Sequence, residues 1–179
     1  LIAQHNPINI AKSISTLDVI SKGRFEMGIG YGWNREEMFN HGVEFSTRRE
    51  RVRETMLAVK QLWTEDEAEF HGEFIDFDPS WAWPKPVKEK GPRIMLGGAP
   101  GPTIFQHIAE FGNGWMPIGG SGIKASLSDL QKVCESNERD FSEISIVPFG
   151  TVPDQGKLDY FEELGVDEVI LRVPAGPRE

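Results

Sequence analysis

The residues best suited to hold a ligand are glycines at the end of a short apolar strand. Gly28-Ile29-Gly30-Tyr31-Gly32-Trp33 closes the strand expected over residues 24–30. Glycines at alternate positions let a flat ligand or a phosphate group approach the backbone closely. Functional groups gather at the carboxyl ends of parallel strands, so this segment is a candidate binding site. The alternative is a tightly packed interior without room for Cβ atoms, and the glycines alone do not decide between the two.

A second glycine-rich segment, Leu96-Gly97-Gly98-Ala99-Pro100-Gly101-Pro102-Thr103, joins a strand to a helix that begins at Pro102. Backbone N–H groups and the positive dipole end at a helix start bind anions. The segment therefore predicts a phosphate site, with an ordinary tight turn as the alternative. Pro100 and Pro102 lack N–H groups, which counts against the phosphate site.

Neither glycine segment matches a nucleotide-binding motif. The dinucleotide fingerprint would need a glycine where Trp33 or Arg35 stands. A Walker loop fails between Gly150 and Gly156-Lys157, because the spacing is one residue too long and Leu158 stands where Ser or Thr should bind magnesium.

The ionisable residues show no catalytic pattern. No metal site is expected, because three histidines lack metal-ligand spacing with one another: His5, His41 and His71. The single cysteine, Cys134, excludes an intrachain disulfide and fits a reducing, cytoplasmic location. Arginines crowd the start of one expected helix: Arg48, Arg49, Arg51 and Arg53. We expect a solvated face there, from which one arginine could reach a phosphate.

Alternating helices and strands must position these segments. Asn6-Pro7 predicts a helix start and Gly23 its end, and Thr47-x-x-Glu50 predicts a capping box before a long helix. Further helices are expected at residues 35–40, 102–111, 127–133 and 158–164. Strands are expected at residues 24–30, 93–96, 114–118, 144–149 and 168–173. The long stretch 66–92 reads as an extended excursion that contains a hairpin, and such stretches are often functional.

This pattern predicts an α/β fold, because short strands with β-branched residues on both faces suit a parallel sheet covered by helices. An open doubly wound sheet and part of a (β/α)₈ barrel both fit. The chain of 179 residues has 39% hydrophobic residues and a net charge of −9, which suits one soluble domain over residues 1–179 and argues against a nucleic-acid partner. No apolar run approaches the roughly 18 residues that span a bilayer, so no membrane partner is expected.

A series of short motifs, in order along the chain, resembles the luciferase-like monooxygenase superfamily, and within it the branch of F420-dependent oxidoreductases. The first is Leu17-Asp18-Val19-Ile20-Ser21-Lys22-Gly23-Arg24-Phe25, which is similar to the family's LD-x-x-S-x-GR segment. The others follow in the family's order: Gly28-x-Gly30-x-Gly32-Trp33, Glu36-Glu37, Gly42, Phe45, Arg48 or Arg49, Leu62-Trp63, Gly72-x-Phe74, Pro84-x-Pro86, Pro92-x-Ile94, Gly97-Gly98 and Gly114-Trp115.

The resemblance implies a (β/α)₈ TIM barrel of which this chain supplies the fourth to eighth strands. The chain begins with Leu rather than Met, and we expect it to be incomplete at the N-terminus and to lack the final helix. An incomplete barrel leaves an open edge, through which we expect a homo-oligomer to form.

The resemblance also implies redox chemistry on a small organic substrate, with coenzyme F420 or, alternatively, FMN as cofactor. By position, Gly30, Gly32 and Trp33 would contact the cofactor ring or its side chain. The phosphate would lie at Gly97, Gly98, Ala99 and Thr103. Trp81 and Trp83 would cover the substrate as part of a lid. No catalytic side chain can be assigned, and a catalytically inactive interaction or structural module is the alternative function.

Overall fold

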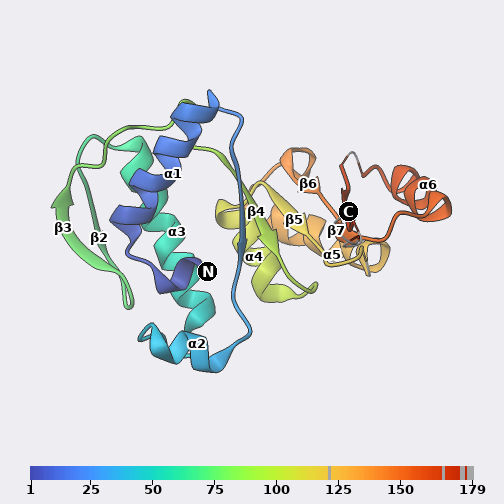
Figure 1. Ribbon diagram of the computed structural model, residues 1–179, viewed down its shortest axis with the longest axis horizontal. Coiled ribbons are helices and arrows are strands. Elements are labelled where there is room, and N and C mark those ends of the chain that lie inside the picture. The colour runs from blue at the N-terminus through green and yellow to red at the C-terminus, as the bar shows by residue number, and fades with distance from the viewer. Residues whose placement is uncertain (121, 167, 174–175, 177–179) are drawn as a thin grey trace. The chain divides into compact units, whose positions relative to one another are not determined.

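Two compact units make up the chain. The computed structural model describes residues 1–120, 122–166, 168–173 and 176. One unit spans Leu1–Ile94 and the other Met95–Glu179, and each is described by itself. Figure 1 shows helices and strands in both units.

Two long helices, α1 (Pro7–Ser21) and α3 (Arg48–Thr64), pack side by side in the first unit (Figure 1). Asn6 caps α1 as predicted, because its side-chain oxygen accepts two N–H groups of the first turn, at 3.0 and 3.2 Å. The indole N–H of Trp63 donates to the carbonyl of Ala11 at 3.1 Å. This buried hydrogen bond joins the two helices.

The start of α3 differs from the prediction. Thr47 precedes the helix, but its side chain makes no capping hydrogen bond and its backbone is already helical (φ −92°, ψ −4°). Its hydroxyl donates instead to the carbonyl of Glu44 at 3.0 Å. A capping side chain reaches the first turn from an extended backbone, so the predicted capping box is wrong.

The glycine-rich strand lies near its predicted place. β1 (Glu26–Gly30) starts two residues later than predicted, and buried Met27 and Ile29 alternate with exposed neighbours. After it comes α2 (Arg35–Asn40), with the predicted bounds. A short 3₁₀ helix, η1 (Ile2–Gln4), precedes α1.

The excursion over residues 66–92 contains the predicted hairpin. β2 (Ala68–His71) pairs antiparallel with β3 (Asp76–Ser80), and Phe70 lies opposite Phe77. Figure 1 shows the hairpin beside α3, within the same unit. The excursion then leads to β4 (Arg93–Gly97), whose first residue forms an ion pair of 2.7 Å with Glu26 at the start of β1.

Parallel strands and helices alternate in the second unit, as predicted for an α/β fold. The elements after β4 are α4 (Pro102–Phe111), β5 (Gly114–Met116), α5 (Ile123–Ser136), the 3₁₀ helix η2 (Phe141–Glu143), β6 (Ser145–Ile146), β7 (Phe149–Thr151), α6 (Gln155–Glu163) and β8 (Ile170–Leu171). β5 pairs in parallel with β4 and β6, and β7 pairs in parallel with β8.

The strand predicted at residues 144–149 is divided into β6 and β7. Successive N–H groups of Ser145, Val147 and Phe149 still donate along one neighbouring stretch, to the carbonyls of residues 113, 115 and 117 at 3.0, 2.9 and 3.0 Å. The segment therefore runs parallel to β5 as predicted. Among the described residues, no helix is long and apolar enough to cross a membrane.

Candidate functional site

The glycine segment after β1 is shaped partly by the protein's own packing. Gly32 has a φ of +80°, and a Cβ there would lie 2.2 Å from Cε of the fully buried Met38. This residue must be glycine for local reasons, which supports the packing alternative at this position. Gly28 and Gly30, in contrast, help to line a cavity of about 260 Å³ with Ile2 and other residues of the N-terminus.

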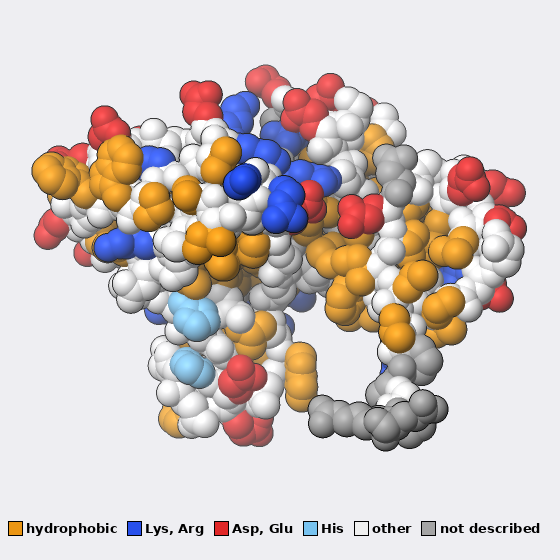
Figure 2. Space-filling model, turned by 45° about the horizontal axis from the view of Figure 1, so that its top comes forward, with side chains coloured by type: hydrophobic (Ala, Val, Ile, Leu, Met, Phe, Trp, Pro, Cys, Tyr) orange, Lys and Arg blue, Asp and Glu red, His pale blue; other side chains and the backbone are white. Residues whose placement is uncertain are grey.

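Trp33 follows these glycines and is 86% exposed. It therefore offers an apolar ring that no described side chain covers, as a residue facing a cofactor would. Figure 2 shows that hydrophobic side chains also reach the surface elsewhere, among charged ones. Exposure of Trp33 is thus compatible with the predicted role but does not by itself identify a ligand.

Arg48 holds the glycine segment in place. Its Nε donates to the carbonyl of Gly32 at 3.2 Å, and its Nη1 donates to the carbonyl of Phe45 at 2.7 Å. Burial, followed by the charges of Arg49 and Arg35, lowers the pKa of the Arg48 guanidinium from its ordinary value. Of the two arginines that the family motif allows, Arg48 is therefore the one bonded to the glycine segment.

Tyr31 is a residue of this segment that the sequence did not single out. Burial raises the pKa of the Tyr31 phenol to about 12. The charge of Arg49 lowers this pKa, and the charge of Glu50 raises it. The phenol is therefore protonated at neutral pH. Its place between two glycines was the only signal that could have found it.

The second glycine segment forms an open turn at the start of α4. Two hydrogen bonds hold Gly98. Its N–H donates to the backbone carbonyl of Met116 at 3.4 Å, and its own carbonyl accepts the indole N–H of Trp115 at 2.9 Å. Gly101, the N-cap residue, has no side chain to cap α4, and a Cβ there would meet no atom within 4 Å. The first-turn N–H of Thr103 therefore receives no side-chain cap from Gly101, and such an uncapped helix start suits a phosphate oxygen.

A hollow of about 460 Å³ opens beside this turn within the second unit. It is lined by the turn and by α5: Pro100, Gly101, Pro102, Phe105, Ser126, Asp129, Lys132 and Val133. Lys132 and Asp129 form an ion pair of 3.3 Å in it. The predicted residues Gly97, Gly98 and Ala99 belong to this turn and Thr103 lies in the first turn of α4, but none of the four lines the hollow.

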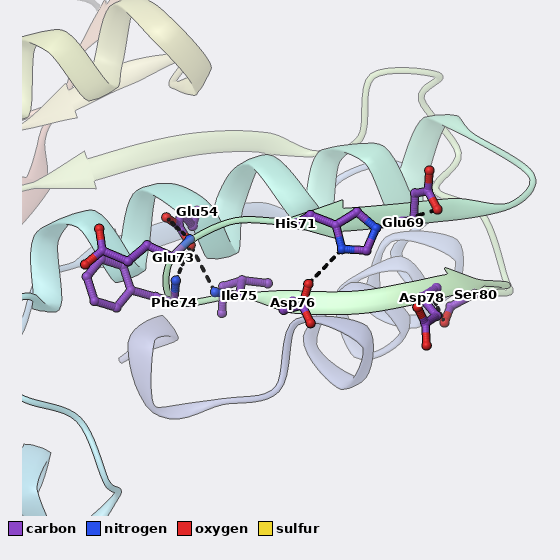
Figure 3. A network of polar contacts seen from close by, with 9 residues as sticks. All are labelled: Glu54, Glu69, His71, Glu73, Phe74, Ile75, Asp76, Asp78 and Ser80. Atoms are coloured by element: carbon purple, nitrogen blue, oxygen red, sulfur yellow. Dashed lines mark hydrogen bonds and ion pairs between the residues drawn. The ribbon is translucent and has the colours of Figure 1, made fainter.

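The hairpin of the excursion is anchored by one carboxylate of α3. Glu54 accepts the N–H groups of Glu73, Phe74 and Ile75 at 3.0, 2.7 and 2.9 Å, as Figure 3 shows. Glu54 is only 9% exposed. Three converging donors on one buried carboxylate fix the hairpin turn to the helix.

The segment that carries the two predicted lid tryptophans is also anchored. The indole N–H of Trp81 donates to Glu67 at 2.8 Å. The Lys85 ammonium donates to the carbonyls of Leu62, at 2.9 Å, and of Glu65, at the end of α3. Trp81 and Trp83 are 71% and 57% exposed, so both rings point away from the core of this unit.

A pH-dependent contact lies in the hairpin. The hydrogen bond of 2.7 Å with Asp76 raises the pKa of His71 above its ordinary value, and the charges of Asp76 and Glu69 add to the effect (Figure 3). Because the pKa is raised in the folded state, protonated His71 stabilises the hairpin fully below the unfolded value of about 6.5. This stabilisation is lost as the pH rises through the folded pKa.

We therefore expect a histidine pKa above the ordinary value when His71 is titrated by NMR. Asp76→Asn should lower it, because the amide does not carry the charge that favours the imidazolium. His41→Gln, elsewhere in the first unit, serves to assign the signals without changing His71. The same pKa for His71 in the wild type and in Asp76→Asn would contradict the expectation.

The single cysteine is poorly suited to act as a nucleophile. Cys134 is buried, and burial raises the pKa of its thiol. In the described part of the chain, no group of three or more His, Cys, Asp or Glu side chains could hold a metal ion. The predicted residues are suited to binding: the first unit has glycine backbone and an exposed indole, and the second unit has a helix start without a side-chain cap.

Comparisons with known proteins agree with this picture. A family model described as luciferase-like monooxygenase matches residues 1–153. An uncharacterized protein of Mycobacterium tuberculosis is 41% identical over 173 residues, which cover 96% of this chain and 60% of that protein. The FMNH₂-dependent dimethylsulfone monooxygenase of Pseudomonas putida is 30% identical over 138 residues, which cover 74% of this chain and 38% of that enzyme.

The solved structure of an F420-dependent secondary alcohol dehydrogenase, in complex with an F420-acetone adduct, superposes with a TM-score of 0.77 at 16% identity. The match covers 93% of this chain and 69% of that one. Such neighbours are TIM-barrel enzymes, and the likeness confirms the predicted α/β fold as part of a barrel. The chain spans about 60% of the length of the mycobacterial relative.

Proposed function

The chain belongs to the luciferase-like monooxygenase family, and on that premise we propose that it is part of an oxidoreductase that binds coenzyme F420 and acts on a small organic substrate. FMN is the alternative cofactor, because relatives with each cofactor are similar to this chain. Either group would supply the redox chemistry, by hydride transfer in the case of F420 or by oxygenation in the case of FMN.

The open turn at the start of α4 carries the proposal. Gly101 leaves the first-turn N–H groups of α4 without a side-chain cap, and a Cβ at Gly101 would meet no atom within 4 Å. The cofactor phosphate would lie there, against Gly97, Gly98, Ala99 and Thr103. In this proposal the chain's own part is to bind that group through backbone N–H groups and the helix dipole.

The remaining predicted roles complete the proposal. Gly30, Gly32 and Trp33 would contact the ring or its side chain, supported by Arg48 on the Gly32 carbonyl. Trp81 and Trp83 would cover the substrate. Because Glu54 and Lys85 anchor the excursion to α3, we propose a fixed cover in place of a swinging lid.

Substitution of Gly101 by aspartate tests the phosphate site. The backbone of Gly101 is extended (φ 166°), and an added Cβ would meet no atom within 4 Å, so an aspartate at this position can cap α4. We expect stability to rise by only about 0.3 kcal/mol, because glycine is itself a tolerated N-cap residue. The carboxylate would occupy the anion site and repel a phosphate, so affinity for F420 or FMN should fall by at least about tenfold.

The affinity is measured by fluorescence titration of the purified protein with F420 and, separately, with FMN. Gly101→Ala is the matched control, because it adds only the Cβ, and it should bind like the wild type. A gain in stability together with a loss of affinity would show that Gly101→Asp blocks the site without damaging the fold. Unchanged cofactor binding by Gly101→Asp would place the phosphate elsewhere, and a wild type that binds neither cofactor would overturn the proposal.

A further inference from the structure

Three arginines from two helices converge on the segment that follows β1. The guanidinium carbons of Arg35 and Arg48 lie 4.3 and 3.7 Å from the centre of the Phe45 ring. That of Arg49 lies 5.5 Å from the centre of the Tyr31 ring. These side chains, which we call the arginine cluster, therefore share one small region of the first unit.

Two carboxylates near the arginine cluster, Glu44 and Glu50, form no ion pair with it. Among the described residues, none of the three arginines forms an ion pair. The charge of Glu44 acts on Arg35, but its Oε1 already accepts the N–H and the hydroxyl of Ser46, at 3.2 and 3.1 Å. The charges of Arg49 and Arg35 in turn disfavour protonated Arg48. An anion bound here would relieve this repulsion.

The donors of the arginine cluster are arranged for a bound anion. Arg48 donates from Nε and Nη1 to backbone carbonyls, which hold its side chain in place. Arg35 and Arg49 are exposed, and their guanidinium groups donate no hydrogen bond to the described residues. Arg35 and Arg49 therefore keep N–H donors for a ligand beside the fixed Arg48, and guanidinium groups recognise carboxylate and phosphate oxygens.

Another arginine of the same helix is ruled out by its contacts. Arg51 donates from Nε to the carbonyl of Ala3 at 3.0 Å and so bonds α3 to η1. Arg51 therefore does not belong to the arginine cluster. Arg35 comes from α2 and joins the cluster only in the folded chain.

We propose that the arginine cluster binds an anionic group of the substrate, a phosphate or a carboxylate, beside Gly32 and Trp33. The substrate would then be a small organic acid or a phosphate ester. This assignment to the substrate rests on the proposed function, in which the cofactor phosphate occupies the turn at the start of α4.

Calorimetric titration with inorganic phosphate, against sodium chloride of equal ionic strength, tests the arginine cluster. The titrations are made in the Gly101→Asp background, so that the α4 turn does not contribute. Arg49→Gln and Arg35→Gln should each weaken phosphate binding about tenfold, the effect of losing a hydrogen bond to a charged group. Lys12→Gln, which removes an exposed charge from α1 of the same unit, is the matched control and should leave binding unchanged.

Three results would overturn the inference. The protein could show no phosphate binding beyond that of chloride, or Lys12→Gln could weaken binding as much as Arg49→Gln. Arg49→Gln and Arg35→Gln could also weaken the binding of F420 or FMN to the otherwise wild-type protein as much as the binding of phosphate, which would assign the arginines to the cofactor. Cofactor binding without phosphate binding would overturn this inference alone, whereas phosphate binding without cofactor binding would overturn the proposed function.

Discussion

Replacing Glu54 by alanine should lower the free energy of unfolding by about 3 kcal/mol, because three N–H groups that now share one carboxylate would lose their acceptor. The N–H of Ile75 suffers most, since that residue is only 5% exposed and water reaches it poorly. The N–H groups of Glu73 and Phe74 lie nearer to solvent and can recover part of the loss. Urea denaturation followed by circular dichroism measures the change.

Two variants make this result specific to the anchoring contact. Glu73→Ala removes a carboxylate from the same turn but none of the three hydrogen bonds, so it should cost less than about 0.5 kcal/mol, as surface substitutions usually do. Glu54→Gln keeps one acceptor oxygen but places an amide N–H against a backbone donor. Its loss of stability should therefore lie between those of Glu54→Ala and Glu73→Ala. Equal losses for Glu54→Ala and Glu73→Ala would mean that the carboxylate does not anchor the hairpin.

Replacing Trp115 by alanine should cost about 3–5 kcal/mol, the range for removing a large aromatic side chain from a packed core. Trp115 is fully buried, and its ring meets that of Phe105 edge to face, with centres 5.4 Å apart. Its indole N–H also binds the carbonyl of Gly98. The substitution therefore removes core volume and the support of the glycine turn together.

Trp115→Phe separates these two contributions. It keeps most of the apolar ring but removes the N–H, so stability should fall by about 1–2 kcal/mol, mainly from the unpaired carbonyl. Affinity for F420 or FMN should fall as well, because Gly98 would no longer be held. Leu130→Ala, which truncates a fully buried residue of α5 and leaves this hydrogen bond in place, should reduce stability while preserving affinity. Undiminished cofactor affinity in Trp115→Phe would show that the turn does not depend on the indole.

Local signals predicted the elements well where the cause lies within one turn of chain. Asn6 caps α1, α4 has the predicted bounds Pro102–Phe111, and Gly112 follows its end. The capping box at Thr47 failed although its residues have the right spacing. Its hydroxyl found the carbonyl of Glu44 instead, and short hydroxyl side chains often exchange such backbone partners.

Strand ends, like the ends of α5 and α6, often differ from the prediction. β8 covers only Ile170–Leu171 of the six residues predicted, and β5 stops at Met116, two residues early. A strand ends where its neighbour ceases to pair with it. The neighbour lies far away in sequence, so strand boundaries are not contained in the local pattern.

The glycine segments after β1 and β4 were recognisable from the sequence alone, because glycine at such positions has few substitutes. The sequence alone did not show why a glycine is present at each of these positions. Gly32 is required by Met38, whereas Gly101 borders open space, and only the folded chain distinguishes packing from an open site.

The sequence by itself determined the alternation of helices and strands, the family and the two glycine turns, since these depend on backbone preferences and neighbours a few residues apart. Tertiary structure alone decided the rest: that Glu54 holds a turn some twenty residues away, that Arg48 reaches Gly32, and that Arg35 joins the arginine cluster. Each of these contacts joins segments separated by a loop. Which residues meet depends on how distant parts of the chain fold together, and a local sequence pattern does not contain that information.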